Sequence, residues 1–311
     1  MKLSLSTNWC NRRIESGEEI AEKALELGFD ELELGFRTRG ESVPGFRRML
    51  DRIPVGSVHA FCPVPLSAPY GHPELYALAS FDDEARAMAR FQVKRSVEFA
   101  ADIGADVVVL HAGRIAFDTV FRRDFSSQTL TAARRNVDAG DAKYAKLLAR
   151  ARKVRDARAA KMMDVFRAEL DALVPVLEKN RVTLALENLP YLEAFPDESE
   201  MAKLRAALGD APVKAWFDTG HHRVREMHGW LAKDFERIPA ESEFGDIAGM
   251  HLNDVEDFCD DHLPPGEGKV DFAALKPLAR SVGHVVFEPN PSVREEALSK
   301  GLALIRGIWE S

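Results

Sequence analysis

The stretch from Val213 to His222, VKAWFDTGHH, places one carboxylate and two imidazoles at the end of an apolar run. The run predicts a buried strand that ends on Asp218, and the Thr-Gly turn after it opens that end to its surroundings. His221 follows Asp218 by three residues, so both side chains can reach the same space. Carboxylate and imidazole are the usual ligands of divalent metal ions. The stretch therefore predicts one corner of a metal site.

Other predicted strands also end on acidic residues or histidines. Apolar runs predict strands over 55–60, 106–110, 182–186, 247–252 and 284–287. They carry, or are followed at once by, His59, His111, Glu187, His251 and Glu288. Each residue alone would be an ordinary core or salt-bridge residue. As a set they are costly to bury without compensation, and a shared metal ion provides that compensation.

A second cluster follows the strand over 247–252. Asp260 and His262 have the spacing of a two-ligand clip, and the Gly266-Glu267-Gly268 turn lets the backbone approach a ligand or phosphate closely. For the other acidic residues of this loop, a solvated surface is the simpler interpretation.

The predicted elements alternate between strand and helix from end to end. Helices are expected over 17–28, 43–50, 82–103, 197–208 and 271–282, with a last one ending at 309, and strands also over 2–9 and 31–35. This alternation predicts an α/β fold with a parallel sheet, and eight repeats predict a (β/α)8 TIM barrel in a single domain over 1–311. A doubly wound sheet is the alternative, but the G-x-G-x-x-G motif after the first strand is absent. Barrel active sites lie at the carboxyl ends of the strands, where the residues above would meet.

The composition indicates a soluble protein with a large core. The chain has 311 residues, is 46% hydrophobic and 30% charged, and has a net charge of -8. No signal peptide or membrane-spanning run is recognisable. The three cysteines fit a reducing compartment, so a cytoplasmic location is expected. The sequence is compatible with a homo-oligomer, and its acidity disfavours a nucleic-acid partner.

These motifs together resemble the xylose isomerase-like TIM-barrel superfamily, from VHAF at His59 to VVFEPN at Glu288. The superfamily includes sugar and sugar-phosphate isomerases and epimerases as well as an endonuclease IV branch (AP endonuclease family 2). For the epimerase branch, the resemblance implies one divalent metal ion, often manganese, held by Glu187, Asp218, His251 and Glu288. It also implies that His221 contacts the substrate.

The endonuclease branch holds three zinc ions, and its ligand positions all have matches here. The matches are His59, His111, Glu187, Asp218, His221, His251, Asp260, His262 and Glu288. The Gly-Glu-Gly turn also resembles that branch. The continuation Asn188-Leu189-Pro190-Tyr191 departs from it, and many epimerase-branch members share several of the histidines. The resemblance leaves both branches open.

For an isomerase or epimerase, the task is to remove a proton next to a carbonyl group and return it through an enediolate. Glu187 and Glu288 are the expected pair of bases and also metal ligands. The substrate contacts are expected to come from His221, which would orient a hydroxyl group, and from His59, His111 and His262. Glu33, at the end of the strand over 31–35, could bind another hydroxyl group or could be a surface residue.

Residues 114–167 form a basic, helical insertion after the fourth strand. They hold fourteen Lys or Arg against six Asp, so the rest of the chain carries about -16. The insertion could pair with acidic surface on this chain or a partner subunit, close as a phosphate-binding lid, or contact nucleic acid. Its few aromatic residues do not suggest a base-stacking surface. Arg114 is the residue expected to contact an anionic group of the substrate.

The leading hypothesis is an isomerase or epimerase that acts on a sugar or sugar phosphate and requires one divalent metal ion, either manganese, zinc, magnesium or cobalt. The alternatives are an endonuclease IV-like phosphodiesterase with up to three zinc ions that cleaves abasic DNA, a non-catalytic ligand-binding barrel, and a dehydratase or lyase. Which sugar would be bound does not follow from the sequence.

Overall fold

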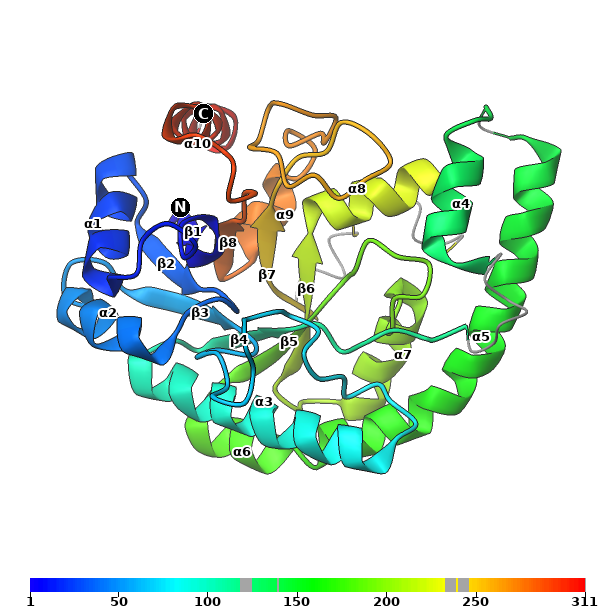
Figure 1. The fold of residues 1–311 in the computed structure, drawn as a ribbon, viewed down its shortest axis with the longest axis horizontal. Coiled ribbons are helices and arrows are strands. Elements are labelled where there is room, and N and C mark those ends of the chain that lie inside the picture. The colour runs from blue at the N-terminus through cyan, green and yellow to red at the C-terminus, as the bar shows by residue number, and fades with distance from the viewer. Residues whose placement is uncertain (118–124, 139, 233–238, 240–245, 311) are drawn as a thin grey trace.

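The computed structural model describes residues 1–117, 125–138, 140–232, 239 and 246–310. Its strands form a closed parallel barrel in the order β1 to β8, as predicted (Figure 1). The strands are β1 (Ser4–Ser6), β2 (Glu31–Leu34), β3 (Val55–His59), β4 (Val107–Leu110), β5 (Thr183–Glu187), β6 (Val213–Asp218), β7 (Ile247–Leu252) and β8 (His284–Phe287).

Helices connect the strands and surround the barrel. They are α1 (Gly17–Leu27), α2 (Val43–Met49), α3 (Asp83–Ile103), α4 (Ser127–Arg134), α5 (Ala142–Asp171), α6 (Val174–Asn180), α7 (Glu198–Leu208), α8 (Thr219–His228), α9 (Lys276–Ser281) and α10 (Glu295–Trp309), with the 3-10 turns η1 (Thr7–Trp9) and η2 (Gly40–Ser42). In the described part of the chain, none of the helices has the length and apolar character needed to cross a membrane.

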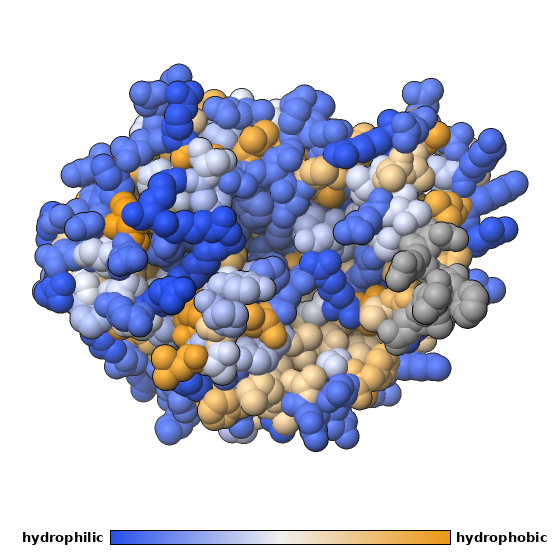
Figure 2. Space-filling view, viewed as in Figure 1, coloured by the Kyte–Doolittle hydropathy of each residue, from blue (hydrophilic) through white to orange (hydrophobic). Residues whose placement is uncertain are grey.

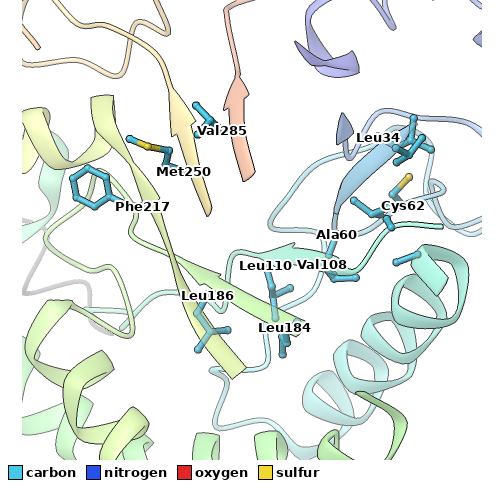
Figure 3. Packing of buried hydrophobic residues seen from close by; sticks show 14 of the residues in the cluster. Leu34, Ala60, Cys62, Val108, Leu110, Leu184, Leu186, Phe217, Met250 and Val285 are labelled. Carbon is cyan, nitrogen blue, oxygen red and sulfur yellow. The ribbon is translucent and has the colours of Figure 1, made fainter. Parts of the chain in front are cut away.

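The two faces of each strand have different partners, because successive side chains point to opposite sides of a strand. Val108, Leu110, Leu184 and Leu186 point away from the barrel and belong to the core that the strands share with the helices (Figure 3). The inward face ends in the polar residues described below. Beneath them the barrel is filled by Trp216, for which Gly249 leaves room: a Cβ at that position would lie 2.3 Å from the indole.

Two predicted elements are shorter than expected. The first strand covers Ser4–Ser6 instead of 2–9, because the chain turns into η1 and the Thr7 hydroxyl accepts a hydrogen bond from Gly35 N. The helix predicted over 271–282 begins only at Lys276. The side chain of Asp271 closes a turn onto Ala274 N, and Pro277 stands in the first turn of the helix, where proline is well accommodated.

The insertion extends the barrel on one side. Its long helix, α5, has two parts with different partners. Met162 and Phe166 belong to the main core, whereas Tyr144 and Ala151 join a separate cluster with Trp230. Figure 1 shows α4 and the start of α5 standing beside the barrel rather than over it. Part of the predicted insertion, 118–124 and 139, lies outside the described residues.

His228 ties α8 to this separate cluster. Its ring stacks on Trp230 at 3.9 Å, and its Nε2 donates to the carbonyl of Phe258. Burial lowers the pKa of His228 from 6.5 to about 4. An imidazole with a lowered pKa in the folded state stabilises the fold above pH 6.5, and that contribution is lost as the pH falls through about 4.

We therefore expect the free energy of unfolding to decrease by up to about 3 kcal/mol as the pH falls through this range. The His228→Phe variant keeps an aromatic ring against Trp230 but has no titrating group. Urea unfolding at a series of pH values should show a flatter profile for this variant. Identical profiles for the two proteins would contradict this role for His228.

Candidate metal centre

The carboxyl ends of β3 to β8 meet around one space. His59, Glu187 and Asp218 are the last residues of β3, β5 and β6, and His251 on β7 pairs in register with Asp218. Residues 111 and 288 directly follow β4 and β8. Figure 2 shows a hydrophilic hollow near the middle of the face in view. The barrel closure thus brings the predicted strand-end residues together.

The central group consists of Glu187, Asp218, His251 and Glu288. One ligand atom from each lies within 4.8 Å of all the others. His251 Nδ1 is 3.1 Å from Glu187 Oε1, 3.3 Å from Glu288 Oε2 and 3.8 Å from Asp218 Oδ2. All four residues are buried, so these donors face one another with little solvent between them.

The His59 group consists of His59, His111 and Glu187. The two imidazole Nε2 atoms lie 3.2 Å and 3.0 Å from Glu187 Oε2. The other carboxylate oxygen of Glu187 belongs to the central group. Glu187 therefore joins the two groups in the manner of a carboxylate that bridges two metal positions.

The His221 group consists of His221, Asp260 and His262. Asp260 Oδ2 is 3.3 Å from His221 Nε2 and 3.2 Å from His262 Nε2, and Asp260 Oδ1 is buried without a hydrogen-bond partner. His221 stands in the first turn of α8, whereas Asp260 and His262 come from the loop between β7 and α9. The clip predicted from the sequence is thus closed by a histidine from another element.

In most of these imidazoles, the ring nitrogen that faces away from the group forms a hydrogen bond to a backbone carbonyl. The Nδ1 atoms of His59, His221 and His262 donate to the carbonyl oxygens of Ala60, Asn188 and Glu288 at 2.9, 2.7 and 2.8 Å. Metal-binding histidines are usually fixed in this way, because the outer hydrogen bond sets the tautomer and the ring orientation. The inner nitrogens are thereby left to face the carboxylates.

For His251, the outer hydrogen-bond partner is a carboxylate, that of Glu33. Its side chain is fully buried, accepts a hydrogen bond from Ser57 and lies 3.1 Å from His251 Nε2. The sequence suggested a hydroxyl ligand of the substrate or a surface residue at this position. The structure instead places Glu33 behind His251, without access to the cavity described below, because its side chain points into the barrel.

The effect of Glu33 on His251 gives a testable prediction. We expect Glu33→Gln to lower metal affinity by about 10–100-fold, because the amide no longer supports the imidazole with a charged acceptor. Competition with a fluorescent chelator would measure the affinity. The Glu31→Gln variant on the same strand, whose carboxylate pairs with Lys2 far from the site, serves as the matched control. Equal affinities in both variants and the wild type would argue against the role of Glu33.

Arg114 lies at the edge of the site but is already paired. Its Nε and Nη2 donate to the two oxygens of Glu74 at 2.9 and 2.7 Å, and its guanidinium stacks 3.5 Å above the ring of Tyr191. Glu74 also approaches His111 Nδ1 to 3.8 Å. Arg114, predicted to contact an anionic group of the substrate, is therefore paired with Glu74 of this chain, because the loop after β3 brings Glu74 to it.

Several polar residues that the sequence analysis did not single out fix the carboxylates. Asn8 donates to Glu288 Oε1 at 3.1 Å, and Asn253 donates to Asp218 Oδ2 at 2.7 Å. Asn188 accepts a hydrogen bond from the backbone N–H of Asp218. Asn188 directly follows the predicted ligand Glu187, and Asn253 lies two residues after the predicted ligand His251. This proximity in the sequence could have identified both residues, whereas Asn8 is not close to any predicted ligand in the sequence.

The carboxylates and imidazoles perturb one another strongly. Burial, with Glu187 close by, raises the pKa of Asp218 to about 6. Burial alone would lower the pKa of His221, but Asp218 and Asp260 outweigh it and raise the pKa to about 10. His262 has a raised pKa for the same reason, chiefly because of Asp260. The raised pKa values of His221 and His262 favour protonated imidazoles that balance the buried carboxylates, and a divalent cation can take over this balancing role.

The donor set fits a divalent metal ion. It combines buried carboxylates with imidazoles that are anchored from behind, and one buried carboxylate oxygen, on Asp260, is left without a partner. These are the donors that zinc, manganese, cobalt and magnesium sites draw on. The central group, the His59 group and the His221 group could each hold such an ion.

A cavity of about 220 Å³ lies directly above the groups. Among the residues that line it are His59, His111, His221, Asp260, His262 and Glu288, together with Phe36, Arg37, Arg114 and Tyr191. The other residues of the central group, Glu187, Asp218 and His251, do not line the cavity and lie beneath its floor. A molecule in the cavity would thus meet histidines, two arginines and the carboxylates of Glu288, Asp260 and Glu74.

The comparisons with known proteins agree on the fold. A family model described as xylose isomerase-like TIM barrel matches residues 21–308. No curated protein matches the chain.

Similar solved structures include a D-tagatose 3-epimerase-like protein, with 20% identity over 99% of both chains and a TM-score of 0.61. They also include the apo form of the 3-keto-D-glucoside 4-epimerase YcjR from E. coli, with 16% identity over 99% of both chains and a TM-score of 0.66. A third is the IOLI protein with a binding zinc atom, with 15% identity over 100% of this chain and 98% of the other, and a TM-score of 0.64. At these identities the likeness shows a shared fold. Because the family model spans nearly the whole sequence, the chain belongs to the xylose isomerase-like TIM barrel family.

Proposed function

We propose that this chain is a divalent-metal-dependent isomerase or epimerase that acts on a sugar or sugar phosphate. The observation that carries the proposal is the central group at the floor of a cavity of about 220 Å³. That volume is below the roughly 300–1,000 Å³ typical of sites for drug-sized ligands, so it suits a small polar molecule. Several structural neighbours are described as sugar epimerases or as similar to them, which supports the same substrate class.

Glu288 is the residue we assign to proton transfer. It lines the cavity, whereas Glu187 is shielded by His59, His111 and His251. Asn8 holds one Glu288 oxygen and leaves the other directed toward His251. A carboxylate in this position can accept a proton from a carbon next to a carbonyl group and return it.

The position of Glu187 bears on the type of reaction. We expected Glu187 and Glu288 to act as a pair, as inversion at one carbon requires proton transfer on both faces of the substrate. A single carboxylate can instead move a proton between adjacent carbons on one face. We therefore propose isomerisation as the first activity to test, with Glu187 as a metal ligand rather than a base.

A divalent ion bound to Glu187, Asp218, His251 and Glu288 would supply Lewis-acid stabilisation of the negative charge on the enediolate. His221 and His262 line the cavity, each with one nitrogen anchored on a backbone carbonyl. We assign to their inner nitrogens, which also face Asp260, the task of orienting hydroxyl groups of the substrate. His59 and His111 also line the cavity, and their Nε2 atoms face Glu187 Oε2.

The test combines metal analysis with proton exchange. Protein purified without chelator would be analysed for bound metal and then incubated with a panel of aldoses, ketoses and their phosphates in D2O. We expect metal-dependent deuterium incorporation, visible by NMR, that chelation abolishes and added metal restores. The Glu288→Gln variant should be slower by about 100-fold or more. The Glu178→Gln variant, which changes an exposed glutamate on α6, is the matched control.

The possible results are distinct. Deuterium incorporation with release of an epimer, rather than of an aldose–ketose isomer, would identify an epimerase and a second proton carrier. Metal-loaded protein that binds sugars without exchange or conversion would indicate a non-catalytic barrel. Metal-loaded protein with no sugar binding at all would overturn the proposal.

A second candidate function, metal-dependent phosphoester hydrolysis, is favoured by one specific observation. The nine side chains that match the zinc ligands of the endonuclease IV branch fall into three groups, and Glu187 bridges two of them. Three metal ions in this arrangement could activate a hydroxide and bind a phosphodiester. The small cavity does not favour a duplex.

Metal stoichiometry and DNA cleavage distinguish the two candidates. Three zinc ions per chain, with cleavage of a duplex that contains an abasic site, would support hydrolysis. Binding to that duplex should then weaken steeply with salt, because phosphate contacts release counterions. One metal ion per chain and no salt-dependent DNA binding would remove this candidate.

A further inference from the structure

The two arginines that line the cavity are in different situations. Arg114 is paired with Glu74 through both ends of its guanidinium group. For Arg37, no carboxylate lies within ion-pair distance in the parts of the chain that the structure describes. Its guanidinium instead lies 4.8 Å from the ring centroid of Phe36. Arg37 thus brings to the wall of the cavity a positive charge that no described carboxylate pairs with directly.

Arg37 lies in the turn after β2, which is hydrogen-bonded to η1 and to the residues that follow it. Its backbone N–H donates to Asn8 Oδ1, and the next residue, Thr38, is fully buried and hydrogen-bonded to Thr7 and Asn11. Asn8 also donates to Glu288. Asn8 therefore contacts both the backbone of Arg37 and the carboxylate of the central group that faces the cavity.

The charge of Arg37 is unfavourable where it stands. The side chain is half-buried, and the neighbouring Arg12 adds a second positive charge. Burial and Arg12 together outweigh the opposing effect of the Glu288 carboxylate and lower the pKa of Arg37. A partly desolvated cation without a partner costs free energy unless a ligand compensates it. The planar guanidinium offers a fork of N–H donors that matches the oxygens of a carboxylate or phosphate.

We propose that Arg37 binds an anionic group of the substrate, a carboxylate or a phosphate, while the rest of the substrate lies over the central group. This inference rests on the proposed function and narrows it: the preferred substrate is a sugar acid or sugar phosphate rather than a neutral sugar. Arg37 is the residue that sets this specificity, and Arg114 keeps its pairing with Glu74.

The experiment compares three ketoses that differ in one group: D-fructose, D-fructose 6-phosphate and D-fructuronate. Binding to the full-length metal-loaded chain would be measured by calorimetry, and proton exchange by NMR in D2O. The variants are Arg37→Gln, Arg37→Lys and Arg39→Gln. Arg39 is exposed two residues further along the same turn and does not line the cavity, so it controls for the loss of one positive charge.

We expect the wild type to bind at least one of the two anionic ketoses about tenfold or more tightly than fructose. Arg37→Gln should remove that preference and leave the affinity for fructose within about threefold, and Arg37→Lys should restore part of it. The identity of the preferred anion separates the carboxylate from the phosphate. Arg39→Gln should behave as the wild type does.

The failure of this inference can be told apart from the failure of the proposed function. If Arg37→Gln weakens all three ligands equally, or leaves the anion preference unchanged, the inference is wrong even where the chain isomerises a sugar. If no ketose undergoes exchange but the anionic ones bind in a manner that depends on Arg37, the proposed function is wrong and the anion site stands.

Discussion

Replacing Glu187 with alanine should remove metal from two positions at once. One oxygen of Glu187 faces His251 in the central group, and the other faces His59 and His111. No other residue in the described part of the chain is shared between two of the three groups. We expect metal affinity to fall by more than about 100-fold, beyond the effect of losing an outer partner, and turnover to fall with it.

The comparison with His262→Ala sharpens this prediction. His262 belongs only to the His221 group, so its loss should leave metal in the central group intact. Elemental analysis of both variants, with Glu178→Gln as the control, would give the metal content per chain. Thermal unfolding would establish that each variant is folded. A Glu187→Ala protein with the metal content of the wild type would refute the bridging role of Glu187.

Replacing Arg155 with alanine should have the largest effect on stability. Arg155 in α5 is buried and donates to both oxygens of Glu200 at 2.6 Å, and it also pairs with Asp197 at 3.0 Å. Asp197 and Glu200 form the capping box at the start of α7. Without the guanidinium, two largely buried carboxylates lose their counter-charge, and removal of one partner from a buried ion pair typically costs about 3–5 kcal/mol.

This loss should appear as a decrease in Tm of roughly 5–15 °C, or as an equivalent decrease in the urea midpoint. Arg150→Ala removes the same charge from an exposed position on α5 and should change the free energy of unfolding by less than about 0.5 kcal/mol. Equal stabilities of the two variants would show that Arg155 is dispensable for joining the insertion to α7.

The architecture followed from the sequence because its signals are local. Each strand of a parallel barrel is covered on both faces and reads as a short apolar run, as in Asp106 to Leu110. The polar residue that ends such a run must lie at the carboxyl edge of the barrel. The positions of Glu187 and Asp218 at this edge could therefore be predicted from the sequence. The fold prediction is confirmed for this reason.

The details that failed depend on contacts between distant parts of the chain. The distance between Glu33 and His251 is fixed by the closure of the barrel, and no local pattern reveals which strand residue stands behind which imidazole. The pairing of Arg114 with Glu74 depends on how the loop after β3 folds back. The bridging position of Glu187 also required the register of β3, β4, β5 and β7.

Much of the basic charge of the insertion has partners within this chain. Arg152 donates to the carbonyls of Gly229 and Leu231, and Arg134 donates to the carbonyl of Met227. Of the described insertion residues, only Arg114 lines the cavity. Several basic side chains of the insertion thus form hydrogen bonds with backbone carbonyls of this chain, so a bound polyanion is not needed to explain them.

The pairing of β1 with β8 closes the barrel late in the sequence, and Glu288 follows β8. During synthesis, the nascent chain therefore lacks both the last seam of the barrel and one of the four donors of the central group until β8 and Glu288 have left the ribosome. A metal ion held by all four donors could be bound only after that point. The choice of ion would then depend on which free divalent cations are available at that point, because imidazole and carboxylate donors select weakly among them.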